Sequence, residues 1–192
     1  MLPAFADPVL DSQRTFRAIL DAMNHPGRVV DLDGCGIAPE PLHAATGAVC
    51  LTLADFDTPL WLDAGASTPD ALAYLRFHCG SRIVEAPEWA RFAVVAEPRS
   101  MPPIAAFNAG SEEFPEGSTT VLVQTEALTA GRGRKLKGPG IKAEARLEAR
   151  GLPDAFWRGL RDNRVLFPRG VDVLLTAGRQ LVALPRTTAV ES

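Results

Sequence analysis

The chain has 192 residues, of which 46% are hydrophobic and 22% charged, and its formal net charge is −3 at pH 7. This composition is typical of a soluble globular domain and excludes a disordered or fibrous chain. The negative charge argues against non-specific nucleic-acid binding as the main activity. The longest stretch without Asp, Glu, Lys or Arg, residues 41–54, is too short to span a membrane, and the N-terminus lacks the pattern of a signal peptide. We therefore expect one domain over residues 1–192, with no nucleic-acid or membrane partner.

The first half of the chain alternates helical and extended patterns. Apolar residues at Phe16, Ile19, Leu20 and Met23 predict a helix over residues 12–25, with Ser12 as its N-cap. Residues 28–33 alternate as a short strand does. A helix rich in small residues is expected from residue 42 to 53, followed by a short apolar strand at 60–62.

The next predicted element is a helix whose start is marked by Thr68, Pro69 and Asp70 and whose end is marked by Gly80. Strands are predicted at 92–95 and 119–125, separated by a proline-rich stretch with a short helix at 104–108. Residues 153–163 form a helical pattern, and residues 171–185 read as a closing hairpin. Strands and helices in this mixed order predict an α/β fold, with a mixed sheet and helices on both of its faces.

Cysteine and histidine are too few and too scattered to predict a metal site. The three cysteines and three histidines are Cys35, Cys50, Cys79, His25, His43 and His78. There is no CxxC pair, and His78 and Cys79 are adjacent and so point apart. We expect reduced thiols, a cytoplasmic location and no metal.

One short segment is basic in an otherwise acidic chain. It contains all three lysines of the protein, and its six cations are Arg132, Arg134, Lys135, Lys137, Lys142 and Arg146. On a strand, Arg132 and Arg134 would share one face while Lys135 and Lys137 would share the other.

Glycines at 131, 133, 138 and 140 bracket these cations and free the backbone to approach a ligand or form tight turns. Pro139 excludes a Walker A loop, which needs a lysine there. Two interpretations stay open: the segment binds a phosphate or an acidic partner surface, or it is a solvated hairpin with two charged faces.

No catalytic constellation stands out from the residues alone. Asp55 and Asp57 are interpreted as turn and capping groups, and Asp172 as an acid that satisfies backbone groups in a turn. A lysine carrying a pyridoxal Schiff base has no support beyond the presence of lysine. The sequence contains neither GxSxG nor HExxH, so we assign no catalytic residue.

Several segments, taken in order, resemble the PhnH family of the bacterial carbon–phosphorus lyase system. They are QRTFR at 13–17 with Met23 and Pro26-Gly27, LTLADFDTPLWL at 51–62, LRFHCG at 75–80, GPGI at 138–141, FPRGVDVLLT at 167–176 and LPRTT at 184–188. Cys79 and Arg169 depart from the residues common in that family. Motif residues without an assigned role include Gly138, Gly140, Asp172 and Arg186.

The resemblance implies a three-layer α/β/α fold similar to the large domain of pyridoxal-phosphate-dependent transferases, but without the cofactor. It also implies a subunit that acts with PhnG, PhnI and PhnL in transferring ribose triphosphate from ATP to an alkylphosphonate. PhnJ, which the resemblance implies as a further partner in the core complex, cleaves the carbon–phosphorus bond in a later step. We accordingly expect a non-catalytic subunit that forms a homodimer. The alternative is an independent phosphate- or nucleotide-binding protein that uses residues 131–142.

Overall fold

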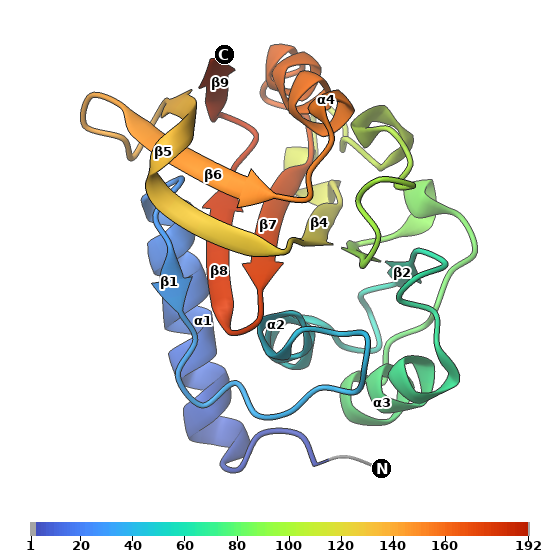
Figure 1. The fold of residues 1–192 in the computed structure, drawn as a ribbon. Helices are drawn as coiled ribbons and strands as arrows, with labels where there is room; N and C mark the ends of the chain where they lie inside the picture. Colours follow the sequence, from blue (N-terminus) through green and yellow to red (C-terminus); the bar gives the residue numbers. More distant parts are fainter. Residues whose placement is uncertain (1–2, 192) are drawn as a thin grey trace.

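The computed structural model describes residues 3–191, which are built around a six-stranded sheet with the order β1-β8-β7-β4-β3-β2 (Figure 1). Its strands are β1 (Val30–Asp31), β2 (Leu60–Leu62), β3 (Phe92–Val95), β4 (Thr120–Gln124), β7 (Asp172–Ala177) and β8 (Gln180–Leu184). The strands β2, β3, β4 and β7 are parallel, whereas β8 is antiparallel to both of its neighbours. The sheet is therefore mixed, as the sequence predicts.

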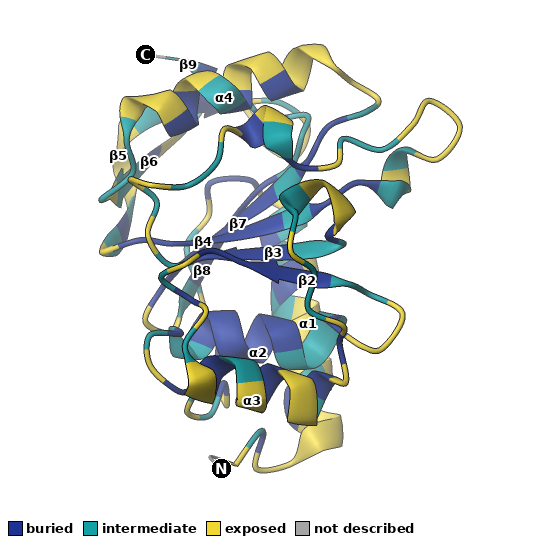
Figure 2. Ribbon diagram, turned by 90° about the vertical axis from the view of Figure 1, so that its right-hand side faces the viewer, coloured by how far each residue is buried: buried dark blue, intermediate teal, exposed yellow. Residues whose placement is uncertain are grey.

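The two faces of this sheet are covered differently (Figure 2). One face carries α1 (Pro8–Asn24), α2 (Ala44–Leu53) and α3 (Pro69–Cys79). The other carries α4 (Asp154–Val165) and a three-stranded antiparallel sheet of β6 (Ala145–Arg150), β5 (Ala127–Lys137) and β9 (Ala189–Glu191). The expected helices on both faces are present, but on the second face a small sheet takes much of the place of helices.

Each face of the sheet has its own apolar core. Leu122 of β4 packs with the core beneath α1, α2 and α3, whereas Val121 and Val123 pack with Phe156 and Trp157 of α4. Alternate side chains of a strand point to opposite faces, so a strand covered on both faces must be apolar throughout. The unbroken apolar run in β4 has this origin.

The structure corrects several predicted boundaries. The first helix begins at Pro8, not after Ser12, because the Asp7 side chain caps it by accepting the backbone N–H groups of Val9 and Leu10. The strand expected at 28–33 shortens to Val30–Asp31, and the helix expected at 104–108 is a single 3-10 turn, Ile104–Ala106. The periodicity of side chains identifies an element, but capping and edge pairing set its ends.

Other sequence signals are confirmed. Thr68 caps α3 by accepting the N–H of Ala71, and Gly80 ends the helix in the left-handed conformation. The closing hairpin is β7 and β8, which pair in antiparallel register across Gly178. All three cysteines are buried free thiols. Within residues 3–191, no helix is long and apolar enough to cross a membrane.

Candidate functional site

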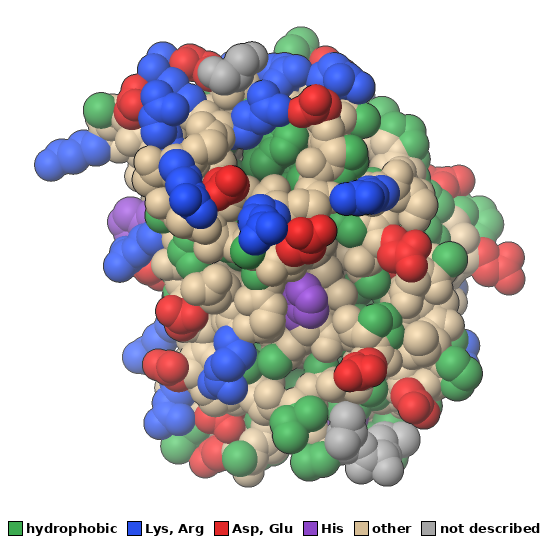
Figure 3. Space-filling view, viewed as in Figure 1, with side chains coloured by type: hydrophobic (Ala, Val, Ile, Leu, Met, Phe, Trp, Pro, Cys, Tyr) green, Lys and Arg blue, Asp and Glu red, His purple; other side chains and the backbone are tan. Residues whose placement is uncertain are grey.

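Four cations of the basic segment lie on β5, and each is paired with an acidic side chain of the same chain. Arg132 Nε lies 2.7 Å from Glu148 Oε2 on the neighbouring strand β6. Arg134 pairs instead with Asp154 at the start of α4. Figure 3 shows basic and acidic side chains interspersed over this part of the surface.

The two lysines of β5 hold the C-terminal strand. Lys137 Nζ is 2.8 Å from Glu191 Oε1 of β9, and Lys135 Nζ is 2.7 Å from Glu144 Oε2 and also contacts Glu191. The hydrogen bond to Glu144 raises the pKa of Lys135, and the hydrogen bond from Lys137 lowers the pKa of Glu191. Both lysines reach Glu191, which confirms that they share a face.

The two arginines do not form a second face in the expected way. A register shift between Ala130 and Arg134 interrupts the pairing of β5 with β6. The bulge separates Arg132 from Arg134, so that they reach different elements. A shared face requires a regular strand, and the glycines at 131 and 133 allow the backbone to depart from one.

Lys142 stands apart from this network, in the turn after β5. A Cβ on Gly140 would overlap the carbonyl oxygen of Asn24, so the 138–141 turn packs directly against the end of α1. Between them lies a shallow pocket of about 390 Å³, lined in part by Arg28, Lys142 and Arg146. Among the described residues, Lys142 has no ion-pair partner within 4.0 Å.

Asp172 and Arg186 form a largely buried clamp. Arg186 Nη2 lies 2.6 Å from Asp172 Oδ2, and the backbone N–H of Arg186 donates to Asp172 Oδ1 at 2.8 Å. The guanidinium also donates to the carbonyl oxygen of Pro115 and to Ser118 Oγ. The clamp joins the start of β7, the segment after β8 and the loop before β4, so Asp172 has the backbone-satisfying role that its turn position predicts.

A second pocket lies where the parallel strands β3 and β4 end, a place that sequence reasoning did not single out. Its volume is about 330 Å³, and its lining residues are His43, Ala96, Glu97, Pro98, Arg99, Gln124, Thr125, Glu126 and Gly151. Ligands of open α/β sheets bind at the carboxyl ends of strands. The available signal was the series of polar residues directly after apolar strands: Asp63, Glu97 and Gln124-Thr125.

His43 is fixed in this pocket by groups from three elements. Its backbone N–H donates to Gln124 Oε1 at 2.6 Å, and Gln124 Nε2 donates to the carbonyl of Pro41 at 2.9 Å. The imidazole Nδ1 lies 3.3 Å from the carbonyl oxygen of Thr176. A carbonyl only accepts, so Nδ1 carries the hydrogen and Nε2 of the neutral ring is an acceptor. Burial lowers the pKa of His43, which favours this neutral form.

Three other kinds of site concern metal binding, a reactive thiol and a lysine with a neutral amine. Across residues 3–191, no group of three or more His, Cys, Asp or Glu side chains is placed to hold a metal ion. Burial raises the pKa of the Cys79 thiol to about 11, so it is protonated at neutral pH. The lysines Lys135 and Lys137 are ion-paired on the surface, an environment that does not favour a neutral amine.

Comparison with known proteins gives a family match along the described chain. The family model "Bacterial phosphonate metabolism protein (PhnH)" matches residues 3–191. The chain is 40% identical over 188 residues to the "Alpha-D-ribose 1-methylphosphonate 5-triphosphate synthase subunit PhnH" of Rhizobium meliloti (strain 1021), covering 98% of this chain and 94% of that protein. It is 33% identical over 179 residues to the "Putative C-P lyase subunit protein HtxG" of Stutzerimonas stutzeri, covering 93% of this chain and 85% of that protein.

Proposed function

This chain belongs to the PhnH family of bacterial phosphonate metabolism proteins, and from that membership we propose that it is a subunit of an alpha-D-ribose 1-methylphosphonate 5-triphosphate synthase. In that role it supports the transfer of ribose triphosphate from ATP to an alkylphosphonate during phosphonate breakdown. The observation that carries the proposal is the 40% identity over 98% of the chain to a relative named as this subunit.

We propose a supporting role for the subunit, not a catalytic one. Four cations that the sequence offers as a site, Arg132, Arg134, Lys135 and Lys137, are matched by carboxylates of the same chain. Large apolar side chains exposed on several elements leave surface that partner subunits can cover; they include Val9, Phe16, Phe77, Trp89 and Phe114. The proposed partners are PhnG, PhnI and PhnJ, with PhnL, and a second copy of this chain.

The finer description of the fold is part of the same proposal. The parallel strands β2, β3, β4 and β7 beside an antiparallel β8 support a relationship to the large domain of pyridoxal-phosphate-dependent transferases. No cofactor is proposed for this subunit, because the lysines of the chain lie on β5 and in the turn after it.

Reconstitution of the synthase with and without this chain tests the proposal. With ATP and methylphosphonate, we expect adenine release to fall when the chain is omitted and to return when purified chain is added back. Equal adenine release in its absence would reject the supporting role.

The surface of β5 is the first place to look for a partner contact. Replacing Arg134, Lys135 and Lys137 by alanine leaves Glu144, Asp154 and Glu191 unmatched and removes the cations that an acidic partner would meet. We expect co-purification with the other subunits to fall in this variant. The difference from the unmodified chain should be largest at low salt, because salt screens the same charge pairs in the unmodified chain.

A matched variant controls for the loss of three charges. Arg17 of α1, Arg76 of α3 and Arg82 after α3 are exposed, and none of them forms an ion pair within 4.0 Å in the part of the chain that the structure describes. Their replacement by alanine removes the same charge away from β5. If both variants assemble equally well across about 50 to 500 mM salt, β5 is not the partner surface.

An independent phosphate- or nucleotide-binding function is the second candidate. The observation that favours it is the pocket between residues 25–28 and 140–146, where Lys142 lacks an ion-pair partner. Equilibrium dialysis of the isolated chain with ATP and with inorganic phosphate tests it. Binding that Lys142→Gln abolishes would support this function, and absence of binding would remove it.

A further inference from the structure

The pocket at the carboxyl ends of β3 and β4 is not used by the proposed supporting role. It is lined by residues from four parts of the chain: the start of α2, the segment after β3, the end of β4 with the residues after it, and the loop before α4. Such a meeting of polar groups at strand ends is where ligands bind in open α/β sheets.

The first feature that selects a ligand is the imidazole Nε2 of His43, a hydrogen-bond acceptor. Gln124 is 4% exposed and uses both atoms of its amide, one on the His43 backbone and one on Pro41. Thr176 holds the Nδ1 hydrogen, and buried Thr46 in turn contacts the Thr176 hydroxyl at 2.8 Å. Buried groups thus fix the imidazole, while Nε2 has no hydrogen-bond partner among the described residues. A neutral imidazole nitrogen of this kind accepts a hydrogen bond from a ligand.

The second determinant is an unmatched set of charges. Glu97, Arg99 and Glu126 line the same pocket, yet the described residues offer none of them an ion-pair partner within 4.0 Å. This differs from β5, where each cation is paired. Two carboxylates against one guanidinium repel a simple anion, and Arg99 repels a simple cation. The lining suits a ligand that carries both charges at separate ends.

Two glycines restrict where the carboxylates lie. A Cβ on Gly65 would lie 2.7 Å from Glu97 Cγ, and one on Gly151 would lie 3.2 Å from Glu126 Cγ. The backbone N–H of Glu97 also donates to buried Asp63 at 2.9 Å. The side chains of both acidic residues therefore lie against these glycines, and both residues line the pocket. Glu97 Oε2 also accepts a hydrogen bond from Ser100 Oγ at 3.5 Å.

We propose that this pocket binds a small zwitterion, an aminoalkyl oxyacid. Its ammonium group meets Nε2 of His43 and the carboxylates of Glu97 and Glu126, and its oxyanion meets Arg99. The pocket volume of about 330 Å³ accommodates a short chain between the two ends. This inference rests on the pocket alone, so it stands whether or not the chain assembles into a synthase.

Nitrogen-15 NMR of the histidine side chains in the intact chain tests the proposal directly. We expect 2-aminoethylphosphonate or β-alanine to shift the Nε2 resonance of His43 saturably, with a Kd at or below about 1 mM. Comparing these two probes distinguishes a phosphonate from a carboxylate as the oxyanion. Methylphosphonate lacks the amine and propylamine lacks the oxyanion, so each should bind at least about fivefold more weakly.

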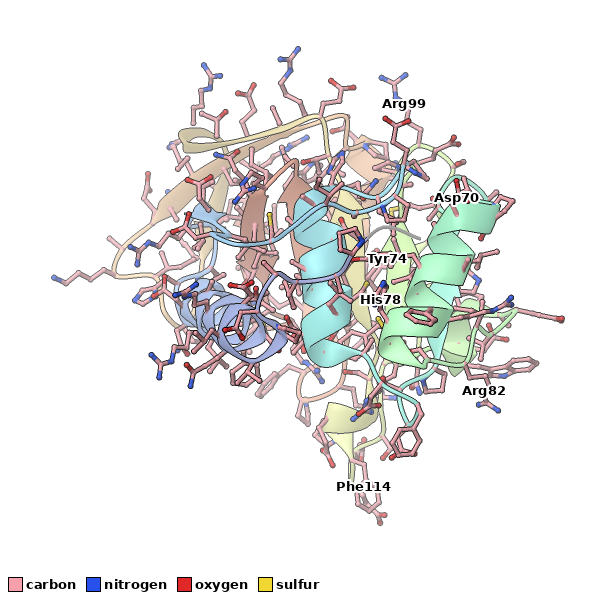
Figure 4. The ribbon with its side chains drawn as sticks, turned by 90° about the horizontal axis from the view of Figure 1, so that it is seen from below. Asp70, Tyr74, His78, Arg82, Arg99 and Phe114 are labelled. Carbon is pink, nitrogen blue, oxygen red and sulfur yellow. The ribbon has the colours of Figure 1, made fainter. Side chains whose placement is uncertain are left out.

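Charge-neutral variants assign the two ends of the ligand. Arg99→Gln and Glu126→Gln should each weaken binding about fivefold or more, because each removes one charge that the zwitterion meets. Arg82→Gln is the matched control, since Arg82 is also exposed but lies far from Arg99 in Figure 4, near the start of β2. Circular dichroism confirms that each variant folds.

The proposal is overturned by any of three results. They are no saturable shift at His43 with either zwitterion, equal affinity for the single-ended probes, or an Arg82→Gln effect as large as that of Arg99→Gln. Binding of either zwitterion with the expected variant pattern supports it.

Discussion

At the residue scale, Asp172 and Arg186 show how a motif can serve structure. The side chains are 17% and 14% exposed, and the pair is extended by hydrogen bonds from the guanidinium to Pro115 and Ser118. Burying two charged side chains costs desolvation free energy, which their mutual attraction offsets. Removing either residue would therefore leave the other as an unpaired, largely buried charge. The clamp also fixes the loop that leads into β4, at the end of the sheet opposite the strand-end pocket.

Removing Arg186 should therefore destabilise the fold. Arg186→Met leaves Asp172 with an uncompensated, largely buried charge, and we expect the free energy of unfolding to fall by about 3 kcal/mol. Urea denaturation measures it. The control is Arg134→Met, because Asp154, its partner, is 74% exposed, and such a pair contributes less than about 1 kcal/mol. Similar losses in the two variants would contradict the clamp.

His43 gives a prediction for pH dependence. Burial lowers its pKa in the folded chain below the ordinary value of 6.5, so the unfolded chain binds a proton that the folded chain resists. The free energy of unfolding should accordingly fall as the pH drops through 6.5, and the loss should level off below the folded-state pKa.

The comparison of wild type with His43→Gln measures this effect. Glu97, Arg99 and Glu126, the charged groups that share its pocket, are unchanged in the variant. Urea denaturation between about pH 7.5 and 5 should show a shallower pH dependence for the variant. Parallel curves for the two proteins would mean that His43 titrates normally.

At the element scale, the bulge in β5 shapes the basic strand. Gly131 and Gly133 both have positive φ, at 86° and 84°, but their surroundings differ. A Cβ on Gly133 would lie 2.5 Å from the carbonyl oxygen of Leu147 in β6, whereas nothing lies within 4 Å of one on Gly131. Glycine is thus required at position 133 by the close approach of β5 and β6 as well as by its positive φ. At position 131 it is required by the backbone conformation alone.

These two glycines form a matched pair for mutation. Gly131→Ala should cost about 1 kcal/mol, the penalty of a left-handed conformation. Gly133→Ala adds a clash with the β6 backbone and should cost at least about 2 kcal/mol, with faster amide exchange in β5 and β6. Thermal unfolding and hydrogen exchange check both. An equal loss of stability in the two variants would show that the β6 backbone can shift to accommodate the added methyl group.

At the scale of the whole molecule, two cores share one sheet and large apolar side chains are left outside both. On α1, Val9, Phe16 and Leu20 are 77%, 45% and 46% exposed, and they fall on one stripe of the helix while Ile19 and Ala22 face the core. A helix with apolar side chains on two faces has more apolar surface than its own chain covers. This arrangement favours association.

We expect the isolated chain to form a two-fold dimer, the commonest symmetry of homo-oligomers. Light scattering at tens of micromolar measures the mass. Because Phe16 and Leu20 lie outside both cores, their joint replacement by serine should change the free energy of unfolding by no more than about 1 kcal/mol and reduce the dimer fraction. A strict monomer in the wild-type chain would remove the dimer without affecting the proposed complex.

The sequence alone determined much of the local architecture. Alternation, helical periodicity and capping residues predicted α3, β3, β4, α4 and the hairpin of β7 and β8, because these signals act over a few neighbouring residues. The order of the sequence motifs indicated the PhnH family, and the family model matches residues 3–191.

Only the tertiary structure decided which groups meet. The cations of β5 find carboxylates on β6, α4 and β9, and the pocket joins His43 to Gln124, a residue 81 positions away. Sheet order and long-range packing set such pairings, and no local pattern in the sequence encodes the distance between two segments that pair through the sheet. Four cations of the basic segment are therefore paired within the chain, and the pocket at the strand ends emerged only from the fold.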